Sequence, residues 1–158
     1  MSKAVIVTAP DSYLKPEHID KMAIFLAGSI DNGIAPDWQK KVLEALGEHN
    51  IMLMNPRRKD WSQNAGPEEV QKQVKWELEA LEYADLILMY IAKGSKAPIS
   101  LLELGLHAKE ERLVLAVDPA YYRRVNVEVV CGKYNIPLYE TLEELIKHVK
   151  SNINDYNR

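Results

Sequence analysis

The sequence has 158 residues, of which 47% are hydrophobic and 27% charged, the balance of an ordinary globular protein. This length predicts one domain with a core large enough to fold without disulfides or structural metals. The formal net charge of −3 argues against a protein that coats nucleic acid, and the single cysteine, Cys131, excludes an internal disulfide and a cysteine metal cage.

Five short, nearly continuous apolar runs alternate with longer segments of helical periodicity. Runs of this kind are typical of central parallel strands that are covered on both faces. They occupy residues 4–9, 23–27, 51–55, 86–91 and 113–117, and a shorter run at 136–139 would add a sixth strand. Helices are predicted over 36–48, 67–83, 98–109 and 141–152, and from a weaker pattern over 120–133. The alternation predicts a mainly parallel sheet, to which the first run would be an edge addition.

None of the apolar runs approaches the roughly 18 residues of a membrane span. The N-terminal run is too short for a signal peptide and fits a strand better. We therefore expect a single domain over residues 1–158 in the reducing cytoplasm. The four histidines have no zinc-like spacing, so neither a metal nor an organic cofactor is implied.

A carboxylate interrupts the apolar side of the predicted helix 67–83. Four apolar residues form a stripe at helical spacing, and Glu77 falls in its middle. The stripe consists of Val70, Val74, Leu81 and Ala84. A carboxylate on a buried face is costly unless it is paired or hydrogen-bonded, which makes Glu77 a candidate site residue. The alternative is a long side chain that reaches sideways to solvent.

The predicted helix 98–109 carries its polar side chains on one narrow face. Ser100, Glu103 and His107 follow one another at helical spacing, and the remainder is almost entirely apolar. The pattern by itself favours a solvent-exposed polar stripe. The position favours a pocket instead, because ligands of open α/β sheets bind beyond the carboxyl ends of the strands, where Glu103 is expected.

Two loops at the expected carboxyl edge have ligand-binding chemistry. Gly28, Ser29 and Ile30 form a glycine-containing turn between a strand and a helix, which suits a phosphate or a sugar but matches no Walker or dinucleotide fingerprint. The loop NPRRKDW ends with Asp60 and Trp61, a carboxylate and an aromatic ring that suit a planar nucleobase. A solvated charged loop and a simple connecting turn are the alternatives.

Taken together, four segments resemble the nucleoside 2-deoxyribosyltransferase superfamily, which includes the 2-deoxynucleoside 5-monophosphate N-hydrolases. The segments read IFLAGSI from residue 24, WELEALEYADLILMYI from 76, SLLELGLHA from 100 and VNVEVV from 125. The resemblance covers about residues 22–146. It implies an α/β fold, a flavodoxin-like or Rossmann-like three-layer sandwich with a five-stranded sheet, or a six-stranded one if the last run contributes.

The resemblance also implies roles for individual residues. Glu103 would be the nucleophile, and Glu77, where the family usually has Asp, would hold the departing base and could supply its proton. The turn 28–30 would line the sugar. Asn126 would reach into the site of a neighbouring subunit, which implies a homo-oligomer, a dimer or larger. The assignment of Asp60 and Trp61 to the nucleobase rests on their chemistry and not on the resemblance.

The sequence departs from the superfamily at two positions. The transferases place Asp six residues before the nucleophile and the hydrolases often place Ser, but Ala97 stands here unless a gap shifts Ser95 or Ser100 into the role. The hydrolases also have an Arg after Gly-Ser-Ile. Asp31 stands there in this sequence and would repel a 5-phosphate, unless the arginines at 57 and 58 compensate.

The sequence therefore predicts an enzyme that cleaves the N-glycosidic bond of a 2-deoxynucleoside through a covalent glycosyl–Glu103 intermediate. The deoxyribose would pass to another nucleobase. One alternative is a nucleoside or nucleoside 5-monophosphate N-hydrolase, and a second is a non-catalytic nucleotide-binding module. The expected ligand is a small-molecule nucleoside or nucleotide, with no part for a nucleic acid polymer or a membrane.

Overall fold

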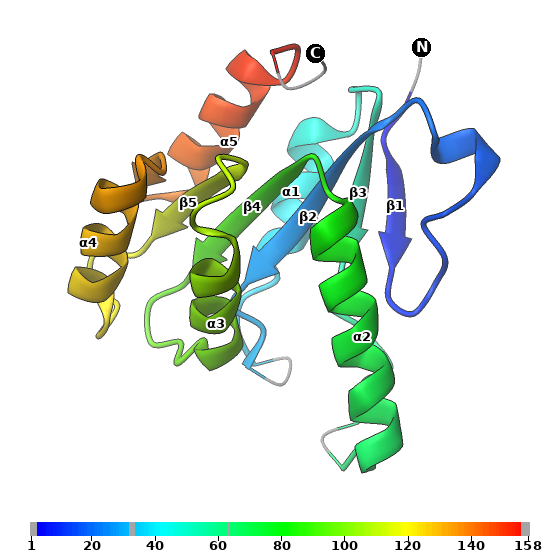
Figure 1. Cartoon of the computed structure of the whole chain (residues 1–158), viewed down its shortest axis with the longest axis horizontal. Coiled ribbons are helices and arrows are strands. Elements are labelled where there is room, and N and C mark those ends of the chain that lie inside the picture. The colour runs from blue at the N-terminus through cyan, green and yellow to red at the C-terminus, as the bar shows by residue number, and fades with distance from the viewer. Residues whose placement is uncertain (1–2, 32–33, 63, 156–158) are drawn as a thin grey trace.

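A sheet of six parallel strands forms the middle layer of the computed structural model, which describes residues 3–31, 34–62 and 64–155 (Figure 1). The strands are β1 (Val5–Thr8), β2 (Met22–Gly28), β3 (Ile51–Asn55), β4 (Leu86–Ile91), β5 (Leu113–Val117) and β6 (Leu138–Tyr139). They lie in the order β1-β3-β2-β4-β5-β6. The predicted parallel sheet is confirmed, with the first strand at an edge and the sixth strand formed.

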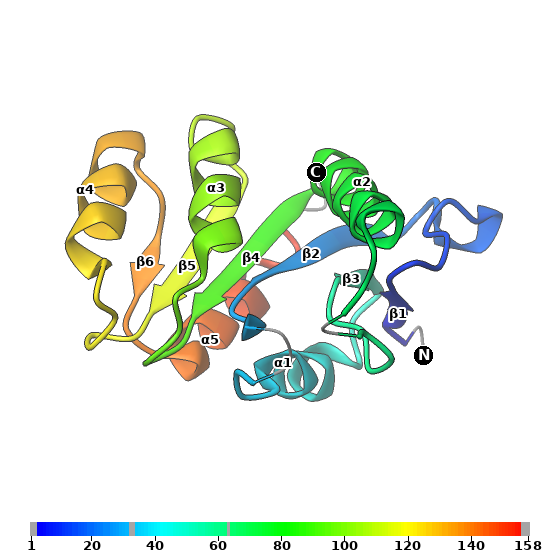
Figure 2. The same ribbon diagram turned by 90° about the horizontal axis from the view of Figure 1, so that it is seen from below.

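Helices cover both faces of the sheet, which makes a three-layer sandwich (Figure 2). The helices are α1 (Trp38–Leu46), α2 (Pro67–Tyr83), α3 (Pro98–His107), α4 (Arg124–Tyr134) and α5 (Leu142–Asn152), with a 3-10 turn η1 (Pro16–His18) after β1. Helices α2, α3 and α4 lie on one face, and α1 and α5 lie on the other. None of the helices in the described part of the chain is long and apolar enough to cross a membrane.

Two hydrophobic cores lie on the two faces of the sheet. Phe25 points into the core under α2, α3 and α4, whereas its neighbours Ile24 and Leu26 point into the core under α1 and α5. All three side chains are fully buried. Because both faces of the central strands are covered, almost every strand residue is apolar, which explains the continuous runs in the sequence.

The helix boundaries follow from local capping. Helix α1 begins at Trp38 and not at 36, because the Asp37 side chain accepts a hydrogen bond from the Lys40 amide and caps the helix. Thr141 caps α5 in the same way, as its sequence pattern predicts. Helix α4 begins at Arg124 and not at 120, because the chain first makes a turn at Asp118.

Helix α2 has the predicted bounds, but only half of the predicted stripe is buried. Leu81 and Ala84 are buried, whereas Val70 and Val74 are 41% and 44% exposed. Trp76 and Ala80 complete the buried face in their place. The indole of Trp76 packs against Phe25 of the sheet and donates a hydrogen bond to the Asp11 carbonyl. These contacts of the largest side chain on the helix fix its rotation.

The order of the strands reverses at β2, and this reversal positions the site. The connection from β2 runs through α1 to β3 on one side, whereas the connection from β4 runs through α3 to β5 on the other. Such a reversal marks the region outside the carboxyl ends of β2 and β4, which corresponds to the crevice in which open α/β sheets bind ligands. Ser29 connects the two strands there, since its amide donates to the Tyr90 carbonyl and its hydroxyl accepts from the Ala92 amide.

We predict that Gly28→Ala destabilises the protein by about 3 kcal/mol or more, because Gly28 has a φ of +135° and an added Cβ would lie 2.0 Å from the Tyr90 carbonyl oxygen. Urea unfolding followed by circular dichroism measures the loss. Gly132→Ala is the matched control, since a Cβ at that position in α4 has no neighbour within 4 Å. Gly132→Ala should be neutral or slightly stabilising. Equal stability of the two variants would contradict the prediction.

Candidate active site

Helix α3 packs with its polar stripe inward. Ser100, Glu103 and His107 are all buried, so the solvent-exposed stripe that the pattern favours is wrong, whereas the pocket that the position favours stays a prediction. Conversely, Leu102 is 58% exposed, and Ile99 and Leu106 are similarly open. Apolar contacts also orient the helix, because Leu104 is buried in the core on this face of the sheet and Leu101 packs against that core.

Glu103 is the most desolvated carboxyl of the site, with only 7% of the residue exposed. Its burial and, to a smaller extent, the nearby charge of Glu77 raise its pKa to about 8. The two carboxyls therefore act on each other across the space between α2 and α3. At neutral pH the pair retains at least one proton, because two adjacent carboxylates out of water repel each other.

Glu77 lies in the third turn of α2, the helix that extends beyond the carboxyl edge of the sheet (Figure 1). Its side chain is largely withdrawn from water, and this burial raises its pKa. A hydrogen bond of 3.2 Å from the Gln73 amide to Glu77 Oε1 opposes that rise. Gln73 is a site residue that the sequence analysis missed, because a glutamine on a helix surface gives no signal distinct from a solvated side chain.

The turn 28–30 lies at the carboxyl end of β2, over which α3 packs. Ser29 is fully buried and tied into the sheet, and its carbonyl also accepts a hydrogen bond from the Trp38 indole. Ile30 is half-buried, and its carbonyl accepts from the Ala35 amide. These hydrogen bonds hold the turn rigidly at the end of the strand over which α3 packs.

The loop after β3 forms its own cluster. Arg58 donates two hydrogen bonds of 3.1 Å to Asp60, and its guanidinium lies 5.2 Å from the centre of the Trp61 ring. Arg57 donates to the carbonyls of Ala35 and Pro36. Both arginines therefore hold protein groups, and the charge of Asp60 is compensated by Arg58. The assignment of Asp60 and Trp61 to a nucleobase stays a prediction.

The position six residues before the nucleophile belongs to a tight backbone turn. Ala97 is buried in the left-handed conformation, with a φ of 48°, directly before α3. Ser95 is also buried, and its hydroxyl has no hydrogen-bond partner among the described residues. Ser100 is buried in the first turn of α3. Ser95 and Ser100 thus flank Ala97 in the chain, two residues before it and three residues after it.

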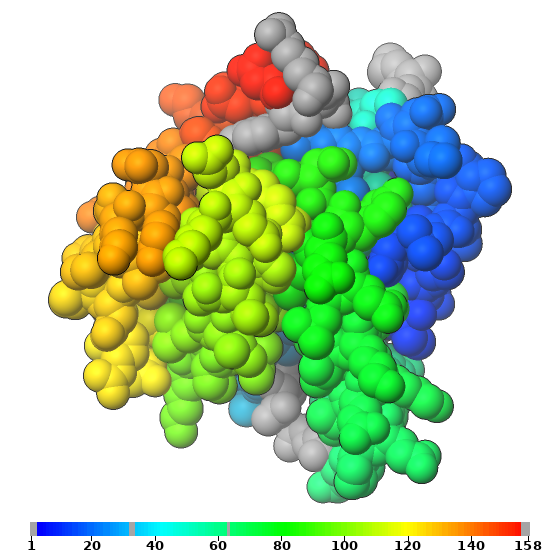
Figure 3. Space-filling view, in the orientation of Figure 1, coloured from blue at the N-terminus to red at the C-terminus, as the bar shows by residue number. Residues whose placement is uncertain are grey.

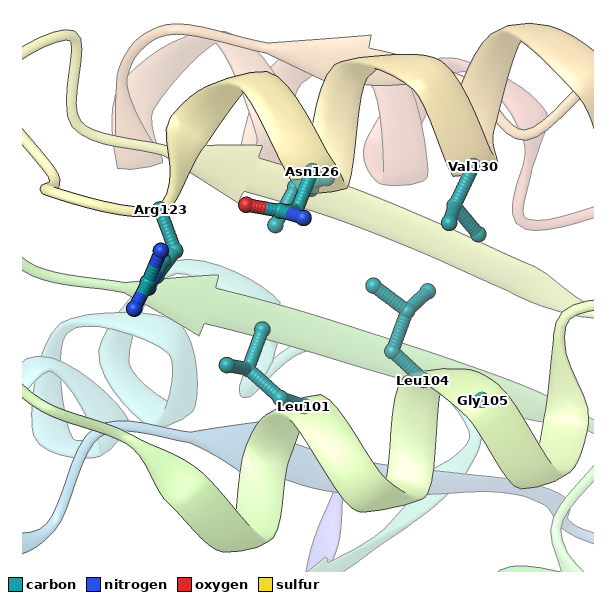
Figure 4. Close-up of a pocket in the computed structure, with 7 residues that line it drawn as sticks. Leu101, Leu104, Gly105, Arg123, Asn126 and Val130 are labelled. Carbon is teal, nitrogen blue, oxygen red and sulfur yellow. The ribbon is translucent and has the colours of Figure 1, made fainter.

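Asn126 lies away from the carboxyl pair within one protomer. It lines a groove of about 290 Å³ between α3 and α4 (Figure 4). The groove is lined by Leu101, Leu104, Gly105, Arg123, Asn126, Val127 and Val130. At about 100° per residue, Leu101 and Glu103 project from nearly opposite sides of α3. The helix therefore separates Asn126 from Glu103, whereas Glu103 and Glu77 are brought together.

Comparison with protein families finds a match over a large part of the chain. The model of a family described as nucleoside 2-deoxyribosyltransferase like matches residues 21–121, more than half of the chain. The matched part contains both carboxyls, the turn 28–30 and the loop with Asp60 and Trp61. The edge strand β1 and Asn126 lie outside it. No curated protein matches the chain.

We predict that Glu103→Gln stabilises the protein at pH 8 by about 2–4 kcal/mol. An unfolded glutamate ionises near its ordinary pKa of 4.5, whereas folded Glu103 ionises only near 8. Between these values the folded state binds more protons, so the free energy of unfolding of the unaltered protein falls as the pH rises. The glutamine variant does not titrate there, and its advantage should grow from pH 5 to pH 8.

Urea unfolding at several pH values measures this difference. Glu44→Gln is the control, because Glu44 is exposed on α1 and should give a nearly pH-independent effect. A Glu103→Gln advantage that is constant across this pH range would show that the carboxyl is not held in its protonated form by burial.

Proposed function

The chain belongs to the nucleoside 2-deoxyribosyltransferase-like family, and we propose that it cleaves the N-glycosidic bond of a 2-deoxynucleoside and transfers the deoxyribose to another nucleobase. The observation that carries the proposal is the interaction between two carboxyls, that of buried Glu103 and that of half-buried Glu77. Exchange at an anomeric carbon with retention needs one carboxylate as nucleophile and one carboxyl as proton donor.

The carboxyl pair holds one proton, and the reactive form is the one with that proton on Glu77 and the negative charge on Glu103. In this form Glu103 attacks C1′ of the deoxyribose. The bond between C1′ and the base nitrogen breaks, and its electron pair leaves with the base, which takes a proton from Glu77. An ester then joins Glu103 to C1′. The nitrogen of a second base attacks C1′, the ester breaks, and the proton of that nitrogen passes to Glu77. Both carboxyls are thereby restored.

Burial of the nucleophile supports transfer over hydrolysis. Glu103 lies on the buried side of α3, with little of its surface open to solvent. A covalent ester at this position would be shielded from water by the same packing, whereas a planar base could approach through the crevice. Water as the acceptor would give the N-hydrolase reaction instead, and the two outcomes are separable by experiment.

The charges around the turn favour a free nucleoside over a 5-monophosphate. Asp31 follows the turn 28–30 and places negative charge where a 5-phosphate would need a cation. The two neighbouring arginines are engaged elsewhere, Arg57 with backbone carbonyls and Arg58 with Asp60 and Glu69. A phosphate in the site would have to compete with these partners.

The outer faces of three adjacent helices support assembly with a second copy of the chain. Figure 3 shows α4, α3 and α2 side by side on one face of the molecule. Exposed apolar residues occur on all three helices: Val70, Val74 and Leu78 on α2; Ile99, Leu102 and Leu106 on α3; Val125 and Val129 on α4. Repeated apolar exposure of this kind marks an interface. We propose a homo-oligomer through this face, in which Asn126 serves the partner's site.

We predict that the protein exchanges bases between a 2-deoxynucleoside and a second free base, and that Glu103→Ala lowers the exchange by at least about a thousandfold. Chromatography of a panel of deoxynucleosides, ribonucleosides and 5-monophosphates, with and without a second base, measures the products. Glu44→Ala is the control and should retain full activity.

Release of a free base without exchange would replace transfer by hydrolysis. If no compound of the panel reacts but some bind, and Glu103→Ala leaves their affinity unchanged, the non-catalytic nucleotide-binding module becomes the better account of the site.

We predict that Leu102→Glu converts the protein to monomers and lowers its activity, because the charge would have to be buried in the proposed interface. Sedimentation measures the mass. Leu14→Glu is the matched control, since Leu14 is an exposed leucine far from α3 in the segment after β1. A monomeric unaltered protein with full activity would exclude the proposal.

Mixing two inactive variants tests whether Asn126 acts in the partner's site. Mixed dimers of Glu103→Ala and Asn126→Ala would contain one intact site each, so an equal mixture should regain activity in roughly a quarter of its sites. If Asn126 served its own protomer, no mixture would regain activity.

A further inference from the structure

Gln73 makes two hydrogen bonds with the same side-chain nitrogen, one turn before Glu77 on α2. Its Nε2 donates to the Pro56 carbonyl at 3.0 Å and to Glu77 Oε1 at 3.2 Å. The first bond connects α2 to the end of β3, and the second connects the amide to the proposed proton donor. Both partners are largely withdrawn from solvent, so neither bond competes freely with water.

The Pro56 carbonyl fixes the orientation of this amide. A carbonyl oxygen only accepts hydrogen bonds, so the NH2 group of Gln73 must face it, and a flipped amide would set two acceptors against each other. One N–H is thereby used on Pro56. The other N–H points to Glu77 Oε1, which must act as the acceptor. The arrangement therefore distinguishes the two oxygens of the Glu77 carboxyl.

We propose that Gln73 is a positioning residue that keeps Glu77 Oε1 unprotonated, so that Oε2 carries the proton given to the departing base. The inference rests on the proposed glycosyl transfer and extends it to the direction of the proton. A carboxyl that is free to rotate would present its proton in several directions, whereas one held by Gln73 presents it in one.

The same hydrogen bond balances the proton affinity of Glu77. Burial raises the pKa of Glu77, and the N–H of Gln73 lowers it by stabilising the ionised form. From α3, the carboxyl of Glu103 faces Glu77 and favours its protonated form when Glu103 is ionised. The loop before α2 acts through the Pro56 carbonyl, which holds Gln73. Gln73 thus keeps Glu77 from binding its proton too tightly to release it.

The proposal makes the effect of Gln73 depend on the departing base. A base that is stable as an anion leaves with little help from a proton, whereas a base that is a poor anion depends on Glu77. Loss of the Gln73 hydrogen bond should therefore slow the reaction most for the least acidic bases. A merely structural defect would slow all bases alike.

The test compares Gln73→Met with Gln71→Met. Methionine matches glutamine in length and helix preference but donates no hydrogen bond, and Gln71 is exposed on the same helix. The activity kcat/KM is measured on deoxynucleosides whose freed bases span a wide range of acidity. We expect Gln73→Met to lose about tenfold or more on the least acidic base and less than about twofold on the most acidic. Gln71→Met should lose nothing.

The pH dependence gives a second readout. The alkaline limb of kcat/KM reports the deprotonation of Glu77, and it should move to higher pH in Gln73→Met by about one pH unit because the ionised form loses a donor. An equal loss on every base, or an unmoved alkaline limb, would overturn the proposal.

A titration that needs no turnover separates this inference from the proposed function. Carbon-13 NMR of the labelled Glu77 carboxyl should show a higher pKa in Gln73→Met than in the unaltered protein and in Gln71→Met. If the unaltered protein cleaves no nucleoside, the glycosyl transfer fails, but a raised Glu77 pKa would still uphold the Gln73 contact. An unchanged Glu77 pKa would overturn the role of Gln73 whatever the reaction.

Discussion

The burial of Glu103 beside Glu77 is the constraint on which the arrangement of the surrounding helices depends. A carboxyl out of water is unfavourable, and a second carboxyl nearby makes its ionisation more so, as its pKa of about 8 reflects. The protein reaches this state by turning α3 so that its polar side meets the crevice. Ile99, Leu102 and Leu106 of α3 are then exposed. The arrangement therefore has two unfavourable contributions: a carboxyl removed from water and apolar side chains in contact with water.

The junction of β2 and β4 is what makes such a rotation possible. The absence of a Cβ at Gly28 lets the two strands approach, and Ser29 ties them together at their carboxyl ends. Trp38 holds the same point from the opposite face of the sheet through its bond to the Ser29 carbonyl. This rigid junction fixes the position and the direction of α3, because α3 packs over β2. The site therefore inherits its geometry from the sheet and not from its own side chains.

The sequence predicts the sheet well because its signal is local and strong: both faces of β3, β4 and β5 are buried, so their runs are apolar throughout. The start of α2 is also predicted, since Pro67 marks it. Rotations of helices are not predictable in the same way. Val70 and Val74 suit the core as well as Trp76 does, and only the contacts of Trp76 with distant residues decide between them. Gln73 was missed for a similar reason, because its role depends on a carbonyl 17 residues away in the chain. The inward position of Glu103 was predicted because its place after β4 agreed with the resemblance, although periodicity alone pointed to solvent. Glu77 was singled out by periodicity itself.

Both unfavourable contributions of the α3 rotation would be offset if a second copy of the chain covered the outer face of α2, α3 and α4. Burying apolar surface contributes about 25 cal/mol for each Å² removed from water, and the exposed residues of α2, α3 and α4 together offer a broad surface for it. A covering copy would stabilise the rotation of α3 that keeps Glu103 inward. It would also bring the partner's Asn126 toward Glu103, from which α3 separates the Asn126 of the same protomer. Assembly and the protonation of the nucleophile would then be linked, because any change that loosens the outer contact would also let water reach the carboxyl pair and lower the pKa of Glu103. Covering the apolar outer face of α3 in this way would supply free energy that offsets the burial of the polar residues on its inner face.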